Sequence, residues 1–285
     1  MINLPSVFRF APSPNGQLHL GHAYSALLNY QLAMEAGGRF LVRVEDIDQT
    51  RCTPELERAM LRDLAWLGLK WEEPVRRQSM HFGEFAKALQ SLEALGLTYR
   101  SQLSRGDVRR IVEAHEKTGK AWPRDPDGAP LFPGQTHELD AADADNNFAI
   151  RLKTQAAIEH IGGPFEWQEL VFGGTDKMIE SDPKKWGDVV LARRDTPTSY
   201  HLSVVVDDAI QGVSHIVRGS DLYEATGMHI LLQKLLGLPK PLYHHHALIL
   251  GENGQKLSKS KNGTSIAQLR QAGATPNEIR QMVGL

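Results

Sequence analysis

The sequence predicts an α/β protein built around a parallel β-sheet. The first observation is a strand–helix–strand unit, because apolar runs at 6–12 and 39–45 flank a helical pattern at 22–36. The two strands of such a unit lie parallel in one sheet, since the helix carries the chain back across it. The second observation is a set of later strand-like apolar runs, at 188–192, 202–206, 213–217 and 247–250.

Turn and capping residues delimit the elements of the first half. The helical pattern ends at Gly37 and Gly38, which is a common signal for a helix C-terminus. The strand that follows, at 39–45, is apolar enough to be buried on both faces of a sheet. Thr53 followed by Pro54 predicts the N-cap and first residue of the next helix.

The second half begins with a region of a different composition. Residues 118–147 are rich in Gly, Pro, Asp and Asn, which predicts an inserted, loop-rich subdomain. Near the end of the chain, Thr275 and Glu278 have the spacing of a capping box, which predicts a last helix.

Composition limits the possible classes of protein. The 285 residues are 41% hydrophobic and 23% charged, which is enough for a sizeable core. The single cysteine, Cys52, excludes an intramolecular disulfide and a Cys-based zinc site. We find no long apolar run and no secretory signal, so we expect a cytoplasmic protein with no membrane partner.

Net charge alone does not predict nucleic-acid binding, because it is only −2 at pH 7. The C-terminal residues 253–285 are more basic, with five Lys or Arg against the single acidic residue Glu278. This end of the chain is either a contact for nucleic-acid phosphates or an ordinary solvated face.

A first candidate site lies where the turn after the first strand enters the helix. His19 and His22 flank Gly21 there, whereas the P-loop and GxGxxG patterns are absent from the chain. A helix N-terminus attracts phosphate through its N–H groups and dipole, and imidazoles can add hydrogen bonds. Alternatively, the two histidines only cap the helix and Gly21 permits close packing.

A second candidate site lies near the C-terminus. Lys256, Lys259 and Lys261, with Ser258 between them, stand between glycines, which favours a mobile loop of dense positive charge. Such a loop can close over a triphosphate and stabilise the transition state of adenylyl transfer. Alternatively, it is a basic loop exposed to solvent.

Together and in this order, HLGH (19–22) and KLSKS (256–260) resemble the HIGH and KMSKS signatures of class I aminoacyl-tRNA synthetases. That resemblance implies a Rossmann-type core of the HIGH superfamily. RFAPSP (9–14), VRVEDID (42–48), TSYHLSVVVDD (198–208) and HIVRGSD (215–221) are similar to the glutamyl subgroup. Because the chain ends about 25 residues after KLSKS, it is most similar to the shortened branch of that subgroup, which glutamylates queuosine in tRNA(Asp).

The resemblance implies an organisation into four segments. These are two halves of the catalytic core at 1–98 and 187–250, an inserted acceptor-binding-type subdomain at 99–186, and the KLSKS loop with a truncated helical tail at 251–285. No anticodon-binding domain is expected, and we expect a monomer.

The resemblance also implies the roles of the site residues. Arg9 and Arg218 would grip the two carboxylates of glutamate, and the sequence does not say which arginine takes which. Glu45 would pair with the ammonium group, and Tyr200 would add a hydroxyl. A surface salt bridge for Glu45 and a core position for Tyr200 are the simpler alternatives. The glutamate site is expected to comprise Arg9, Phe10, Ala11, Pro12, Ser13, Glu45, Tyr200 and Arg218. The ATP site is expected to comprise His19, Gly21, His22, Lys256, Ser258 and Lys259, with His19, His22 and Lys259 catalytic.

The implied enzyme is a ligase that converts glutamate and ATP, with Mg²⁺ bound to the ATP, into glutamyl-adenylate. A hydroxyl of queuosine at the wobble position of tRNA(Asp) would then displace AMP. Three alternatives stay open. They are a compact glutamyl-tRNA synthetase that charges tRNA(Glu), a small-molecule adenylyltransferase of the same superfamily, and a catalytically inactive tRNA-binding paralogue.

Two departures from the family pattern are visible. Relatives often hold zinc in the insertion, but here Ser101, Leu103, Phe132 and Thr136 occupy the ligand places, so no structural zinc is expected and the insertion must be held by packing. His201 stands where relatives often carry asparagine, so part of the glutamate or ribose contact is expected to differ.

Overall fold

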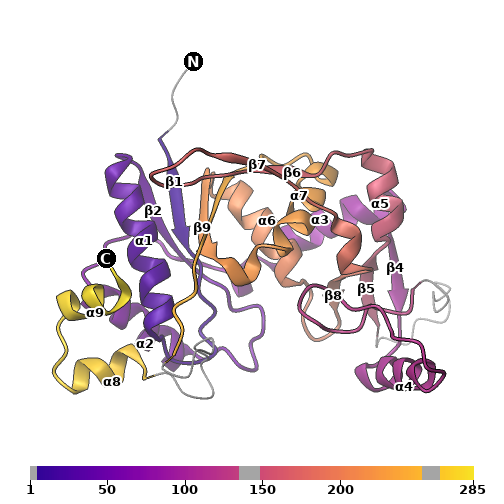
Figure 1. The fold of residues 1–285 in the computed structure, drawn as a ribbon, viewed down its shortest axis with the longest axis horizontal. Helices are drawn as coiled ribbons and strands as arrows, with labels where there is room; N and C mark the ends of the chain where they lie inside the picture. Colours follow the sequence, from indigo (N-terminus) through magenta and orange to yellow (C-terminus); the bar gives the residue numbers. More distant parts are fainter. Residues whose placement is uncertain (1–4, 135–147, 252–263) are drawn as a thin grey trace.

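The computed structural model describes residues 5–134, 148–251 and 264–285, and these contain two β-sheets (Figure 1). The larger sheet has seven strands: β1 (Val7–Phe10), β2 (Arg39–Val44), β3 (Arg76–Arg77), β6 (Glu166–Glu169), β7 (Lys177–Glu180), β9 (His215–Gly219) and β10 (Leu242–His246). The smaller sheet has three: β4 (Thr98–Ser101), β5 (Ala149–Leu152) and β8 (Val190–Arg193).

The larger sheet has the order β3-β2-β1-β9-β10-β6-β7 and is parallel except where β7 pairs with β6. This arrangement confirms the predicted α/β class with a mostly parallel sheet. The order reverses at β1, because β2 and β3 extend the sheet on one side and β9 and β10 on the other. In sheets of this kind, ligands bind outside the carboxyl ends of the strands at such a reversal.

Helices cover both faces of the larger sheet (Figure 1). On one face, α1 (Leu20–Glu35) and α2 (Pro54–Trp66) share a hydrophobic core with the C-terminal helices α8 (Ile266–Gln271) and α9 (Pro276–Val283). The other core contains residues of α3 (Phe82–Ala94), α5 (Thr154–Ile161), α6 (Tyr200–Ile210) and α7 (Ala225–Leu235). The remaining helices of the described residues are α4 (Arg105–Glu116) and the 3₁₀ turns η1 (Gln78–Met80), η3 (Pro183–Trp186) and η4 (Ser220–Leu222).

Most of the predicted elements are confirmed. Strands β1, β2, β8 and β9, and helix α1, overlap the ranges that the apolar patterns indicated, with bounds that differ by no more than two residues. Thr53 caps α2, because its side chain accepts a hydrogen bond from the N–H of Leu56. Thr275 and Glu278 form the expected capping box of α9. The division into segments at residues 98, 186 and 250 stays a prediction.

Two of the predicted strands are wrong. Residues 202–206 lie in helix α6, where all five are buried, so that no polar face interrupts the apolar run. Residues 247–250 form no strand, because the neighbouring strand β10 ends at His246. At 202–206 the apolar run marks burial and not the type of element, whereas at 247–250 it marks neither, since Ala247 and Leu250 are exposed.

Candidate active site

A cavity of about 320 Å³ opens at the carboxyl ends of β1, β2 and β9, at the point where the strand order reverses. All the predicted site residues in the described part of the chain line it. They are Arg9, Phe10, Ala11, Pro12, Ser13, His19, Gly21, His22, Glu45, Tyr200 and Arg218. The predicted Lys256, Ser258 and Lys259 lie outside the described residues.

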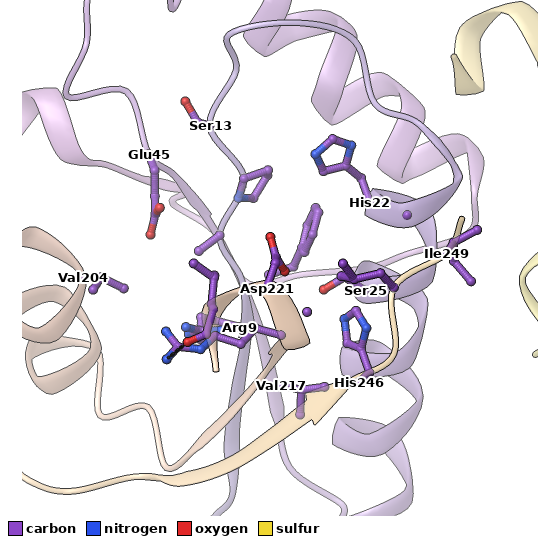
Figure 2. Close-up of a pocket in the computed structure, with 18 of the residues that line it drawn as sticks. Arg9, Ser13, His22, Ser25, Glu45, Val204, Val217, Asp221, His246 and Ile249 are labelled. Atoms are coloured by element: carbon purple, nitrogen blue, oxygen red, sulfur yellow. Dashed lines mark hydrogen bonds between the residues drawn. The ribbon is translucent and has the colours of Figure 1, made fainter. Parts of the chain in front are cut away.

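The cavity has two sides of different chemistry. Figure 2 shows Arg9 and Glu45, a basic and an acidic side chain, on one side of the cavity. His22 and His246 lie on the other side, and Asp221 stands between the two groups. The arrangement can therefore hold a zwitterionic ligand beside a second ligand that accepts hydrogen bonds from imidazoles.

The two histidines at the start of α1 form a capping box. Nδ1 of His19 accepts from the N–H of Gly21 at 3.1 Å, and Nδ1 of His22 accepts from the N–H of His19 at 3.2 Å. Because each Nδ1 accepts, the proton of each neutral ring is on Nε2. Capping and ligand binding are thus compatible, since the two roles use different nitrogens.

Gly21 leaves room for this cap. A Cβ at this position would lie 3.1 Å from Cε1 and 3.2 Å from Nδ1 of His19, closer than most such contacts. A larger residue would therefore require the His19 ring to shift by a few tenths of an ångström. The structure supports the packing role of Gly21 directly.

A chain of buried ion pairs supports the side of the cavity that contains Arg9 and Glu45. Arg9 donates from Nε to Asp208 Oδ1 at 3.1 Å, and Arg43 donates to the same oxygen at 2.7 Å. Arg43 also donates to Glu45 Oε1 at 3.1 Å and faces Asp207 Oδ2 at 3.7 Å. The Arg43 side chain is completely buried, so these carboxylates hold it in one position.

Burial and charge act in opposite directions on the two carboxyl groups of this chain. Burial raises the pKa of Glu45, although the Coulombic attraction of Arg43 and Arg9 opposes it. Burial also opposes ionisation of Asp208, but Arg9 and Arg43 outweigh it and lower the pKa of that group. Asp208 therefore stays ionised as the counter-ion of both arginines, whereas Glu45 takes up a proton more readily than an exposed glutamate.

Arg218 is buried in a different environment, because all its partners are neutral. Its Nε donates to His245 Nε2 at 3.2 Å. Its Nη1 donates to His229 Nδ1 at 3.1 Å and to the Tyr200 hydroxyl at 3.5 Å. Its Nη2 donates to Thr226 Oγ1 at 2.8 Å and to the carbonyl oxygen of Leu222 at 3.2 Å.

Sequence reasoning missed several residues of this site. Arg43 and Asp208 were assigned no role, although they join Arg9 to Glu45. The alternation of a strand was an available signal, because Arg43 and Glu45 are two residues apart and so share one face. Asp221, which also lines the cavity, was not assigned to it either.

Residues 6–285 match the family described as tRNA synthetases class I (E and Q), catalytic domain. The chain belongs to this family. It is therefore an enzyme of the ligase class, as the two signatures implied.

Curated relatives of this class I synthetase chain have two different names. A glutamyl-Q tRNA(Asp) synthetase from Rhodobacter capsulatus is 44% identical over 288 residues, which cover 98% of this chain and 100% of that protein. A second protein of that name, from Geobacter sulfurreducens, is 37% identical over 92% of this chain and 78% of its own length. A glutamate–tRNA ligase from Synechococcus sp. (strain JA-2-3B'a(2-13)) is 36% identical over 97% of this chain, which spans 56% of that protein.

Solved structures support the fold of this synthetase chain. A glutamate–tRNA ligase from Elizabethkingia meningosepticum, in complex with its amino acid, superposes with a TM-score of 0.77 at 23% identity. The match covers 99% of this chain and 60% of that one. A methionyl-tRNA synthetase from Mycobacterium tuberculosis matches with a TM-score of 0.58.

The described residues contain neither a membrane-spanning helix nor a cluster of metal ligands. None of their helices is both long and apolar enough to cross a membrane. No group of three or more His, Cys, Asp or Glu side chains among them is placed to hold a metal ion.

Proposed function

We propose that this synthetase activates glutamate with ATP and transfers it to queuosine at the wobble position of tRNA(Asp). The observation that carries the first step is the single cavity lined by Arg9, Glu45, Tyr200 and Arg218 together with the two histidines of α1. An acidic amino acid has two carboxylates and one ammonium group. The cavity offers two guanidinium groups for the former and a carboxylate for the latter.

ATP would lie on the histidine side of the cavity. The N-terminus of α1 favours negative charge, and the protonated Nε2 of each histidine is a donor for phosphate oxygens. Lys256, Ser258 and Lys259 would complete this site from the KLSKS segment. The Mg²⁺ that accompanies ATP would be held by its phosphates.

The first step is an in-line displacement. A glutamate carboxylate oxygen attacks the α-phosphorus, a new P–O bond forms, and the bond to pyrophosphate breaks. His19, His22 and Lys259 would stabilise the negative charge on the phosphates in the transition state. In the second step a queuosine hydroxyl attacks the activated carbonyl carbon, loses its proton, and AMP leaves.

The choice of acceptor rests on the relatives. The Rhodobacter capsulatus protein, 44% identical over its whole length, carries the name glutamyl-Q tRNA(Asp) synthetase. The glutamate–tRNA ligase from Synechococcus favours tRNA(Glu) as the second candidate, at 36% identity over part of its length.

Lys259→Ala tests the proposed activation step. We expect ATP–pyrophosphate exchange with glutamate to fall by about two to three powers of ten, the usual loss for one electrostatic donor. Lys184→Ala, which removes an exposed lysine of η3, is the control. Exchange by Lys259→Ala within a factor of about two of the wild type would contradict the role.

The acceptor is tested with labelled glutamate and tRNA from cells that do or do not make queuosine. Label that appears only on queuosine-containing tRNA(Asp) supports the proposal. Label on tRNA(Glu) from both kinds of cell supports the second candidate. Exchange without transfer to either tRNA would refute both acceptors and leave only the activation step.

A further inference from the structure

Arg218 and Arg9 both line the cavity, but their surroundings differ in charge. Arg9 forms an ion pair with Asp208. Arg218 forms no ion pair with any carboxylate of the described residues, and its five N–H groups face neutral acceptors. Its positive charge is therefore not neutralised by direct contact with a carboxylate.

The neutral acceptors impose one proton arrangement on the rings, because a guanidinium group only donates. His245 must present a lone pair from Nε2, so its proton is on Nδ1, which faces Glu169 Oε2 at 2.8 Å. His229 must present a lone pair from Nδ1, so its proton is on Nε2. That Nε2 lies 3.2 Å from Nδ1 of His201, which therefore accepts.

Helix geometry places His229 where this contact is possible. Thr226 and His229 are one turn apart on α7, so both side chains reach Arg218 from the same face. His201 reaches His229 from α6, which packs against α7. Burial, followed by the charge of Arg218, lowers the pKa of His229 well below its ordinary value and that of His201 to about 4. Both rings are thus neutral at pH 7.

We propose that His229, backed by His201, is a positioning residue that fixes the Arg218 guanidinium through a neutral acceptor. The charge of Arg218 is then left for a substrate carboxylate, which would replace the long 3.5 Å contact of Nη1 with the Tyr200 hydroxyl. This inference rests on the proposed function, since it deepens the account of the same pocket. It assigns His201, expected from the sequence to alter a ligand contact, to the support of Arg218 instead. The group that accepts from Arg218 must therefore be neutral as well as correctly placed.

Three substitutions separate the charge of the acceptor from its presence. His229→Gln keeps a neutral acceptor, His229→Glu differs from it in charge, and His229→Leu has no acceptor. In ATP–pyrophosphate exchange, we expect His229→Gln to keep KM for glutamate within about threefold of the wild type. We expect His229→Leu to raise it about ten- to a hundredfold, the usual effect of losing a hydrogen bond to a charged group, with KM for ATP little changed.

The His229→Glu variant is the decisive one. Its carboxylate would pair with Arg218, so we expect about a tenfold loss of preference for glutamate over glutamine relative to His229→Gln. Equal preference in the Gln and Glu variants would overturn the inference. A purely structural role would make both variants fail alike.

Gln233→Leu is the matched control, one turn further along α7. Gln233 is also buried, but it donates to the hydroxyl of Tyr243 at 3.1 Å and makes no hydrogen bond to Arg218. Thermal unfolding of all the variants shows whether they fold. A Gln233→Leu enzyme with the same rise in KM for glutamate as His229→Leu would overturn the specific role of His229.

Nitrogen-15 NMR of the histidine rings of the wild type, without any substrate, tests the positioning alone. At neutral pH we expect His229 and His201 protonated on Nε2 and His245 protonated on Nδ1. A proton on Nδ1 of His229 would overturn the inference even if the enzyme uses glutamate. A wild type with this proton arrangement that does not exchange with glutamate would instead overturn the proposed function.

Discussion

The candidate active-site cavity and the predicted insertion (residues 99–186) differ in how deeply their ion pairs are buried. Arg43 and Asp208 beneath the cavity are 0% and 3% exposed in their side chains and hold one another in place. In the insertion, Arg124 and Glu116 form a pair whose side chains are 48% and 37% exposed. Exposed pairs contribute little to stability, whereas a buried charge that loses its partner costs several kcal/mol.

Aromatic packing takes the place of buried charge in the insertion. The Arg151 guanidinium lies 3.5 Å from the centre of the Phe132 ring, and the Tyr99 ring lies beside the same ring. The Tyr99 hydroxyl donates to Asp188 at 2.8 Å. Phe132 stands where the family pattern puts a zinc ligand, so this contact supports a region that relatives often hold with metal. Buried ion pairs therefore fix the charged side chains beside the cavity, whereas the predicted insertion is held by weaker contacts.

The largest effect is expected from breaking the charge chain beneath the cavity. Arg43→Met would leave Asp208 and Glu45 buried without this cation, so we expect the free energy of unfolding to fall by about 3–5 kcal/mol. Urea denaturation measures this change. Arg39→Met on the same strand removes an exposed pair with Glu72 and is expected to cost only about 0–1 kcal/mol. Similar losses in the two variants would show that burial does not set the strength of these pairs.

Glu45→Gln tests the binding side of the cavity with a smaller expected effect. Losing the carboxylate partner of the substrate ammonium should raise KM for glutamate about ten- to a hundredfold in pyrophosphate exchange. Burial raises the pKa of Glu45, so kcat/KM of the wild type should fall on the acid side with a midpoint above the ordinary pKa of a glutamate side chain. Glu45→Gln should abolish that limb of the profile, and an unchanged profile would assign it to another group.

Protonation of Glu45 is expected to change stability and activity in opposite directions. Because the pKa of Glu45 is raised in the folded state, ionised Glu45 costs stability above that pKa. Acidification through the folded pKa relieves the cost while it removes the charge that binds substrate. At pH 7 the Glu45→Gln enzyme should therefore lose affinity for glutamate without losing stability through this group.

The sequence predicted the first half of the core better than the second, and α6 shows why. Thr53 and Pro54 predict the start of α2 because they are typical N-cap and first-turn residues, and β2 follows the glycines that end α1. Residues 202–206 carry no such signal, because a helix buried on every side has no polar face and a run of valines favours a strand. The glycine at position 212, just after α6, was the available sign of a helix end, and in the structure it has a positive φ.

The residues that line the cavity were predicted more completely than the residues that hold them in place. The described site residues gather in one cavity, as the signatures implied. Arg43 was missed because its partners Asp207 and Asp208 directly follow residues 202–206, which were interpreted as a strand, and neighbouring residues of a strand point to opposite faces. His229 was missed because its contact with Arg218 depends on how α7 packs against β9, which no local pattern shows.

The smallest effect is expected from the aromatic contact of the insertion. Phe132→Leu keeps an apolar side chain but removes the ring beneath Arg151, so we expect a loss of about 1 kcal/mol, as for a partly buried cation–π contact. Pyrophosphate exchange should stay within a factor of about two of the wild type, because Phe132 does not line the cavity. Arg124→Ala, which removes an exposed pair of the same region, is the control for thermal unfolding. A loss in Phe132→Leu as large as that in Arg43→Met would mean that the insertion is held as rigidly as the core.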